Sequence, residues 1–537
     1  MALIPALSAA MPDVLLATLN ARYIHASFGL RCLLANMGDL APRTALREYE
    51  ITQRTVDILE EILALSPRIL GLGVYIWNID QTTRLVAELK RLRPELTIVL
   101  GGPEVSYEAS ELEICRLADY VISGEADLAL PLLCRKLLAG TPPPEKFITA
   151  EIPALAQLKL PYHLYSDRDL RERVVYVEAS RGCPFECEFC LSALDIPVRQ
   201  FPLDRFLAAM RDLLDRGCRR FKFVDRTFNL NLRISRAILE FFLDAMVDGR
   251  PLVTSTASEL FLHFEMIPDR LPEGLRETIR RFPPGALQFE VGIQTFDPDV
   301  SLRISRRQDV PRLEENLRWL RAETGVHVHA DLIVGLPGET LASFAAGFDR
   351  LVALGPQEIQ VGLLKRLRGT PIARHEVESR LVYSPAAPYE ILATSTLDFP
   401  TLQRLRRFAR YWDIVANSGQ FAVTTPRLWR DQSPFAGFLA FSDWLYRETD
   451  RTSGIALSKL LELLFRYLTE VCGQSPQEVA TTLWDDYRAG GHSDRPACLR
   501  PWLTAETNVP GQTVSSAALP ERQSRHRRTS QPPPDHP

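Results

Sequence analysis

The chain has 537 residues, too many for one hydrophobic core, and its length predicts roughly three or four domains. Hydrophobic residues make up 46% and charged residues 24%, as in ordinary globular proteins. The formal net charge of −4 gives no general attraction to nucleic acid or membrane surfaces, and no apolar run reaches the ~18 residues of a membrane span.

The cysteine content argues against a disulfide framework. There are nine cysteines, an odd number, and most are scattered along the chain. The N-terminal stretch "MALIPALSAAMPDVLLATLN" lacks the basic start of a secretory signal. We therefore expect a reducing, cytoplasmic location with no membrane partner. The scattered cysteines are Cys32, Cys115, Cys134, Cys218, Cys472 and Cys498.

Residues 11–140 alternate continuous apolar runs, such as "ILGLGVYIW" and "LTIVLGG", with amphipathic stretches. This pattern predicts a doubly wound parallel sheet, with a ligand crevice at the carboxyl ends of its strands. A Pro-rich stretch, "GTPPPEKF", begins a predicted linker over 141–170. The predicted strand ends carry Asn20, Trp77, Asn78, the loop 101–104, Gly124 and Glu125.

Residues 171–376 contain six further strand candidates separated by helical stretches, which predicts a partial or full βα barrel. Residues 377–503 read as mainly helical, and Trp412, Trp429 and Trp444 are expected in their core. The segment 504–537 has few large apolar residues and much Ser, Pro and Arg, so we expect it to be disordered. The fold class is thus α/β with a helical C-terminal domain.

Three cysteines follow the first strand of this barrel, where catalytic loops belong. Cys183, Cys187 and Cys190 have the spacing C-x₃-C-x₂-C, with no fourth cysteine or histidine nearby. A structural zinc site normally needs four closed ligands, and buried structural thiols are a second alternative. Iron–sulfur cubanes are held by cysteine thiolates, normally four, so three would leave one iron open.

The triplet, with Phe189 before its third cysteine, resembles the cluster motif of radical S-adenosylmethionine (SAM) enzymes. The resemblance implies a [4Fe-4S] cluster whose open iron binds the methionine moiety of SAM. One electron from the cluster would cleave SAM to a 5′-deoxyadenosyl radical. It further implies an electron donor such as a flavodoxin or ferredoxin.

Later strands extend the resemblance. "HFEMIP", "VGIQTF" with "SLRISRRQ", "DLIVGLPGET" and "RGTP" look like strands three to six of the coproporphyrinogen-dehydrogenase-like and methylthiotransferase-like branch. The match implies SAM contacts from Glu265, Gln294, Arg306 and Asp331. The usual Gly-Gly-Glu stretch after strand two is replaced by "VDRTFN", where Asp225 is the expected acidic substitute.

The first domain resembles the cobalamin-binding domain of the cobalamin-dependent subgroup. "LNARYIH", "VYIWN", "GGPEVSYE" and "SGEADLALPLL" carry the resemblance, which implies corrinoid contacts from Gly101, Gly102, Glu104 and Gly124. Paired glycines let the backbone approach a flat ring, although a plain Rossmann-like domain also needs glycines in tight turns. The cobalt-ligating Asp-x-His-x-x-Gly motif is absent, and we expect His25 to be structural.

Together these resemblances imply a cobalamin-dependent radical SAM enzyme, most simply a methyltransferase acting on an unactivated carbon of an unknown substrate. Open alternatives are a non-methylating rearrangement and a corrinoid-binding regulator without catalysis. A methylthiotransferase would carry three further clustered N-terminal cysteines, which this chain lacks. The C-terminal region resembles an uncharacterised helical domain that follows such cores, and nucleic acid is not indicated as a partner.

Overall fold

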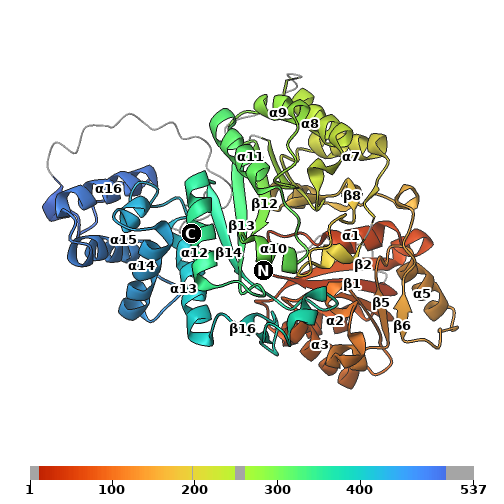
Figure 1. Cartoon of the computed structure of the whole chain (residues 1–537). Coiled ribbons are helices and arrows are strands. Elements are labelled where there is room, and N and C mark those ends of the chain that lie inside the picture. Colours follow the sequence, from red (N-terminus) through yellow and green to blue (C-terminus); the bar gives the residue numbers. More distant parts are fainter. Residues whose placement is uncertain (1–10, 196, 248–259, 504–537) are drawn as a thin grey trace.

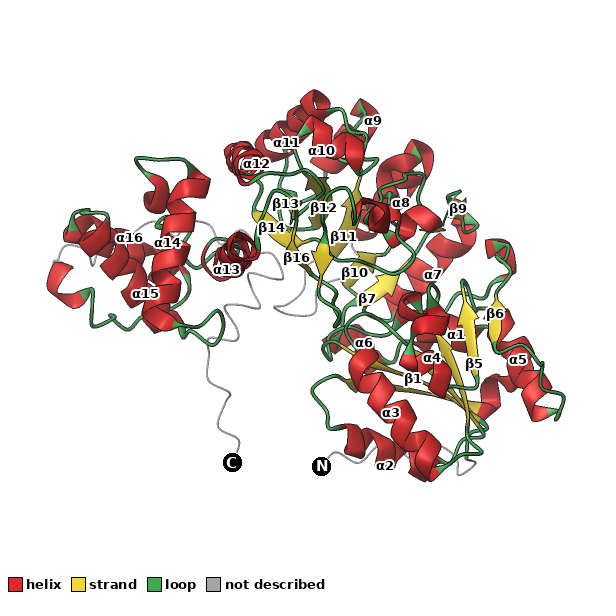
Figure 2. Cartoon of the chain, turned by 60° about the horizontal axis from the view of Figure 1, so that its bottom comes forward, coloured by secondary structure: helices red, strands yellow, loops and turns green. Residues whose placement is uncertain are grey.

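The computed structural model describes residues 11–195, 197–247 and 260–503. The chain forms a first α/β domain, a central parallel sheet with its helices, and a helical C-terminal region. The first domain and the helical region lie at opposite ends, with the central sheet between them (Figures 1 and 2). The predicted disordered tail lies outside the described residues, and no described helix is long and apolar enough to cross a membrane.

The first sheet is parallel throughout, with strand order β2-β1-β3-β4-β5-β6. Strand β1 is buried along its whole length, as expected for a strand covered on both faces. The strands are β1 (Val14–Asn20), β2 (Thr44–Glu50), β3 (Ile69–Gly73), β4 (Thr97–Gly101), β5 (Tyr120–Ser123) and β6 (Phe147–Thr149). The helices are α1 (Phe28–Ala35), α2 (Thr55–Leu65), α3 (Ile79–Leu92), α4 (Glu113–Leu117) and α5 (Ala129–Leu138).

The sheet extends beyond the predicted domain end at residue 140. Strand β6 lies within the predicted linker 141–170 and pairs in parallel with β5. It is three residues long and largely exposed at the sheet edge, so it lacks the apolar run by which the other strands are recognised.

The central sheet is also parallel, with order β14-β13-β12-β11-β10-β7. Strands β14 and β7 form its two edges, so within the described residues this is an open, partial barrel. The strands are β7 (Val175–Val177), β10 (Arg220–Phe223), β11 (Phe261–Met266), β12 (Leu287–Gln294), β13 (His327–Val334) and β14 (Glu358–Leu363). The helices are α6 (Asp167–Glu172), α7 (Leu203–Asp215), α8 (Leu232–Val247), α9 (Glu273–Arg280), α10 (Pro298–Arg303), α11 (Val310–Glu323) and α12 (Leu341–Leu354).

Two short antiparallel pairs and four helices complete the described chain. The pairs are β8 (Ser180–Arg181) with β9 (Arg199–Gln200), and β15 (Val382–Tyr383) with β16 (Ile391–Ala393). The longer helices of the C-terminal region are α13 (Phe399–Val415), α14 (Pro434–Thr449), α15 (Leu457–Arg466) and α16 (Pro476–Ala489).

The helical region shares a hydrophobic core with the central sheet. Phe348 of α12 meets Trp412 of α13 edge to face, with ring centroids 4.7 Å apart. Trp429 stacks on Trp412 at 6.0 Å, and Trp444 packs against the same core. The expectation that these tryptophans belong to the core is confirmed. The region is therefore held firmly against the barrel edge that β14 forms.

Candidate functional site

The cysteine loop follows β7 at the carboxyl end of the central sheet. The Cys183 N–H donates to the Asp195 carbonyl at 2.9 Å, and the Cys190 N–H donates to the Cys187 carbonyl at 3.0 Å. Cys183 and Cys187 are buried, Cys190 is half-buried, and burial raises the pKa of the Cys183 thiol. All three line one cavity of about 180 Å³.

Residues expected from four later segments line the same cavity. Glu265 comes from β11, Gln294 from the end of β12, and Asp331 from β13, while Arg306 follows α10. Phe189, inside the cysteine loop, also lines it. The carboxyl ends of parallel strands meet at one edge of a sheet, which is why residues so distant in sequence converge here.

A bulge in β12 shapes this wall. The register with β13 shifts between Gly292 and Gln294, and Gln294 has a φ of 71°, in the left-handed region. A Cβ at Gly292 would lie 2.4 Å from Gln294 Nε2, and the Gly292 carbonyl accepts hydrogen bonds from Arg306 and Gln308. Bulges re-aim side chains, and this one turns Gln294 into the cavity.

Several buried polar atoms around the cavity have no hydrogen-bond partner. They are Gln294 Oε1, Arg306 Nε, Asp331 Oδ1 and Thr227 Oγ1. His329 Nε2 lies 3.3 Å from Asp331 Oδ1 but without hydrogen-bond geometry. Burial raises the pKa of Asp331. Unpaired buried polar groups are costly, so this set fits a ligand that carries ammonium, carboxylate and hydroxyl groups, as SAM does.

The thiols also have a cation beside them. Arg306 Nη1 lies 3.3 Å from Cys187 Sγ, within hydrogen-bond distance of that sulfur. In the described part of the chain, no three His, Cys, Asp or Glu side chains converge tightly enough to hold a single metal ion. The cysteines line a cavity wall, and their residue type suits an iron–sulfur cluster.

Asp225 does not line this cavity. Its carboxylate accepts hydrogen bonds from the Ala179 N–H at 3.0 Å and the Ser180 hydroxyl at 2.5 Å, bracing the strand end before the cysteines. Burial raises its pKa to about 6. The next residue, Arg226, does line the cavity and pairs with Glu265 at 2.9 Å. The expected acidic contact from this segment is therefore replaced by a cation that holds Glu265.

Arg226 and Glu290 also line the cavity, although the sequence motifs did not predict them. Glu290 accepts from His263 at 2.9 Å and lies 3.5 Å from the Lys222 ammonium. Burial alone would raise the pKa of Glu290, but His263 and Lys222 hold that pKa below its ordinary value. Glu290 precedes Gln294 by four positions in β12, so strand alternation could have placed it on the same inward face.

A second cavity, of about 310 Å³, lies at the carboxyl ends of β3, β4 and β5, beside α1. Gly101, Gly102 and Gly124 line it. Gly102 has a φ of 111°, and a Cβ there would lie 2.4 Å from the Val74 carbonyl, so the fold itself requires this glycine. A Cβ at Gly101 would meet nothing closer than 3.7 Å. Gly101 is thus not required by packing and keeps the cavity open, as a bulky flat cofactor needs.

Glu104 does not line this second cavity. It accepts from the Tyr389 hydroxyl at 2.7 Å and pairs with Arg368 at 3.1 Å, across the boundary with the central region. Glu108 pairs with both Arg368 and Arg366 at 3.2 and 2.9 Å. Burial raises the pKa of Glu104. Here the structure shows an ion-pair cluster between domains where a cofactor contact was expected.

One arginine joins the second cavity to the cysteine loop. Arg181, two residues before Cys183, pairs with Glu125 at 2.7 Å and Asp127 at 2.9 Å. Its other partner is Glu178 at 2.8 Å, whose pKa burial raises to about 7. His25 lies elsewhere, with Nδ1 2.6 Å from the Tyr176 hydroxyl. The loop after β5 is therefore bonded directly to the cysteine loop.

Comparison with known families matches three models to this chain. The radical SAM superfamily matches residues 177–351, the B12 binding domain matches 14–133, and a protein family of unknown function, DUF4080, matches 378–525. The first match spans the three cysteines and the strand-end residues, and the second spans the glycine-lined cavity.

Individual relatives are distant. The 2-(S-pantetheinyl)-carbapenam-3-carboxylate methyltransferase of Streptantibioticus cattleyicolor is 23% identical over 61% of this chain, which spans 51% of the relative. The radical SAM methyltransferase TsrM from Kitasatospora setae, solved with cobalamin and a [4Fe-4S] cluster, has a TM-score of 0.55 at 19% identity, covering 70% of this chain and 80% of that one. The cobalamin-dependent SAM radical enzyme OxsB has a TM-score of 0.57 at 14% identity, covering 90% and 75%. These structures share the fold.

Proposed function

We propose that this chain, which matches the radical SAM superfamily over residues 177–351 and the B12 binding domain over residues 14–133, is a cobalamin-dependent methyltransferase acting on an unactivated carbon. The observation that carries the proposal is the 180 Å³ cavity in which three cysteines meet buried, unpartnered polar groups. The chain spans about half the length of the first curated relative, so the activity of that relative is not carried over as an established property of this chain.

The cysteine cavity would hold the cluster and the methionine moiety of SAM. When bound, these groups supply the electron and the cleavable carbon–sulfur bond, while cobalamin carries the methyl group. Cys183, Cys187 and Cys190 would hold the cluster as thiolates, and Arg306 Nη1, which lies 3.3 Å from Cys187 Sγ, would donate a hydrogen bond to that sulfur. Asp331 accepts hydrogen bonds from an ammonium or hydroxyl group.

Arg226 and Gln294 orient these acceptors. Arg226 fixes the Glu265 carboxylate through a 2.9 Å ion pair, so that its second oxygen stays available to a hydroxyl donor. The bulge at Gln294 holds its amide oxygen in the cavity with no partner of its own. These side chains position a ligand before any chemistry takes place.

The glycine-lined cavity would receive part of the corrinoid, since about 310 Å³ is too small for a whole one. Arg181 links that cavity to the cysteine loop, so that the two cofactor sites are adjacent. We further propose a cytoplasmic location and a flavodoxin or ferredoxin as the electron donor, because the cluster needs a low-potential reductant.

Anaerobic reconstitution tests this proposal. Wild-type protein should bind about four irons per chain, and Cys183→Ala should lose the cluster absorbance. With reductant and SAM it should release 5′-deoxyadenosine, and with added cobalamin it should also form S-adenosylhomocysteine. Zinc in place of iron would refute the assignment. Cluster and corrin binding without either product would favour the regulator, and 5′-deoxyadenosine alone would favour a rearrangement.

A further inference from the structure

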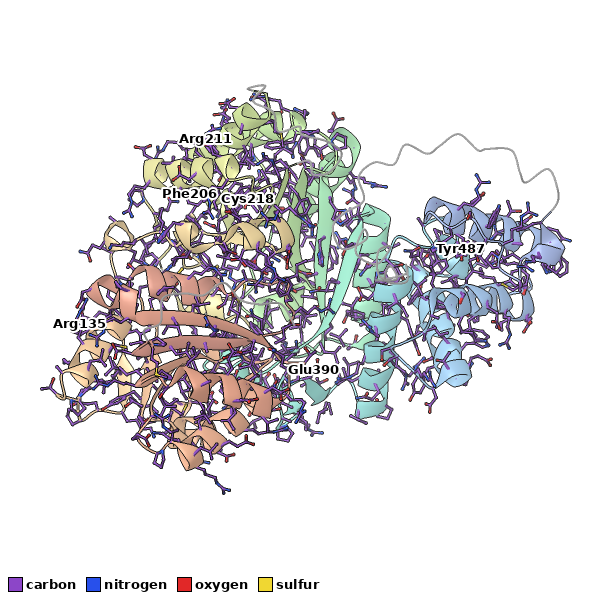
Figure 3. The ribbon with its side chains drawn as sticks, turned by 180° about the vertical axis from the view of Figure 1, so that it is seen from behind. Arg135, Phe206, Arg211, Cys218, Glu390 and Tyr487 are labelled. Carbon is purple, nitrogen blue, oxygen red and sulfur yellow. The ribbon has the colours of Figure 1, made fainter. Side chains whose placement is uncertain are left out.

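A third cavity, of about 550 Å³, lies between the edge strand β14 of the barrel and helix α13 of the C-terminal region. Glu390, labelled in Figure 3 beside α13, is part of its lining. The apolar side chains around it are Phe189, Ile333, Val361, Leu363, Leu364, Leu367 and Ala409. The polar ones are Gln360, Lys365, Glu390, Arg406, Arg410, Asp413 and Asn417.

One end of the cavity lies near the contact between Asn417 and strand β14. The Asn417 side chain, just beyond α13, accepts from the Ile359 N–H at 3.0 Å and donates to the Ile359 carbonyl at 2.9 Å. The amide thereby takes the place of a neighbouring strand at Ile359. Val361 is the next residue with the same orientation, and it faces the cavity.

This cavity adjoins the cysteine cavity by two routes. Phe189, between Cys187 and Cys190, lines both. Gln360 lines this cavity and a polar one of about 200 Å³ inside the barrel, which in turn shares Glu290 with the cysteine cavity. A molecule bound against α13 would therefore lie at the open side of the barrel, next to the proposed site of SAM cleavage.

Among the charged groups that line this cavity, those without an opposite partner are hydrogen-bond donors. Both carboxylates are engaged, Glu390 by Arg406 Nη1 and Asp413 by Arg410 at 3.3 Å. Within the described residues, no carboxylate pairs with the Lys365 ammonium. Arg406 Nε is buried and has no acceptor. An anionic group placed between Lys365 and Arg406 would satisfy both donors.

We propose that this cavity binds an amphipathic organic anion, with its apolar body on Ile333, Val361 and Leu364 and its carboxylate or phosphate group facing Lys365 and Arg406. The C-terminal region thereby supplies one wall of a ligand site through α13. That the ligand is the substrate rests on the proposed function, whereas the binding site itself does not.

Fluorescence titration with 8-anilinonaphthalene-1-sulfonate, an apolar probe with one anionic group, tests the site in the full chain. We expect octanoate and octyl phosphate to displace the probe, while octanol and octylammonium at equal concentration do not. The relative strengths of octanoate and octyl phosphate tell a carboxylate ligand from a phosphate ligand. Displacement by octanol as strong as that by octanoate would overturn the proposal, since it would mean a merely apolar surface.

Variants of the lining residues test whether the probe binds in this cavity. The double variant Lys365→Gln, Arg406→Gln should weaken the octanoate-displaceable binding at least tenfold. Ala409→Phe, which fills the cavity without changing charge, should do the same. The double variant Arg318→Gln, Arg321→Gln, at exposed positions of α11, removes the same two charges and serves as the control. Unchanged binding in both cavity variants would overturn the proposal. Because the titration needs neither cluster nor SAM, its outcome is independent of whether 5′-deoxyadenosine forms.

Discussion

Buried polar groups are hydrogen-bonded differently in the cysteine cavity and at the boundary between the first domain and the barrel. In the cavity, Gln294, Arg306 and Asp331 each keep a buried polar atom without a hydrogen-bond partner, although Asp331 Oδ1 lies 3.3 Å from His329 Nε2. At the boundary, Glu104 accepts from Arg368 and Tyr389. An unpartnered buried polar group lowers stability, whereas a fully bonded one need not. The contrast separates groups that await a ligand from groups that hold domains together.

The boundary should be sensitive to loss of one partner. Arg368→Met leaves the buried Glu104 carboxylate with only Tyr389, and should lower the free energy of unfolding by about 4 kcal/mol. Urea denaturation measures this loss. The double variant Glu104→Gln, Arg368→Met should recover much of it, because no unpaired charge remains. A single variant as stable as wild type would remove the structural role from Glu104.

The buried carboxyl of Asp225 should make the free energy of unfolding depend on pH. Its folded pKa of about 6 lies above the ordinary 3.8, so the folded protein binds this proton more tightly than the unfolded chain. The free energy of unfolding should therefore fall as pH rises from 4 to 6 and stay lower above that range. Asp225→Asn should lack this fall, a difference of about 2 kcal/mol between pH 4 and pH 7. Parallel stability profiles would place Asp225 in a hydrated setting instead.

In the cysteine cavity, loss of a buried carboxylate should weaken ligand binding and leave stability unchanged. Asp331→Asn replaces a buried carboxylate by an amide of the same shape, so the melting temperature should not fall. The affinity for SAM, measured by equilibrium dialysis under anaerobic conditions, should weaken roughly 30-fold, or about 2 kcal/mol. Asp212→Asn, at an exposed site on α7, is the matched control. Lost stability with unchanged SAM affinity would make Asp331 structural.

Gly101→Ala should have the smallest effect on stability. The added methyl group meets nothing within 3.7 Å, so unfolding should shift by less than about 0.5 kcal/mol. Cobalamin retention after gel filtration should nevertheless decrease, because the methyl group occupies the cavity. Gly274→Ala on α9, outside this cavity, provides the control. Full cobalamin retention in Gly101→Ala would leave the glycine without a cofactor role.

The sequence predicted those features that depend on order along the chain. Cysteine spacing identified Cys183, and the resemblance of the later strand motifs implied Glu265, Gln294 and Asp331. The structure gathers these residues because parallel strands bring their carboxyl ends together. The environment of Glu104 could not be predicted, because its partner Arg368 is 264 residues away. Such pairings depend on how domains pack, which local patterns do not encode.

Asp225 and β6 illustrate a second limit. Asp225 directly precedes Arg226, which lines the cavity, yet the Asp225 carboxylate accepts a hydrogen bond from the Ala179 N–H instead. Asp225 lies just beyond β10 and the chain turns at Arg226, and the geometry of that turn decides that Arg226 and not Asp225 lines the cavity. Strand β6 has three residues, two of them exposed, and only pairing with β5 makes it a strand.

The most direct test of the central claim is the electron paramagnetic resonance spectrum of the reduced, reconstituted protein with and without SAM. If the three-cysteine cavity holds a cluster with an open iron beside Asp331 and Arg306, SAM should change the cluster signal in wild type. Asp331→Asn should need roughly 30-fold more SAM for the same change. A wild-type signal that SAM leaves unaltered at saturating concentration would contradict the account.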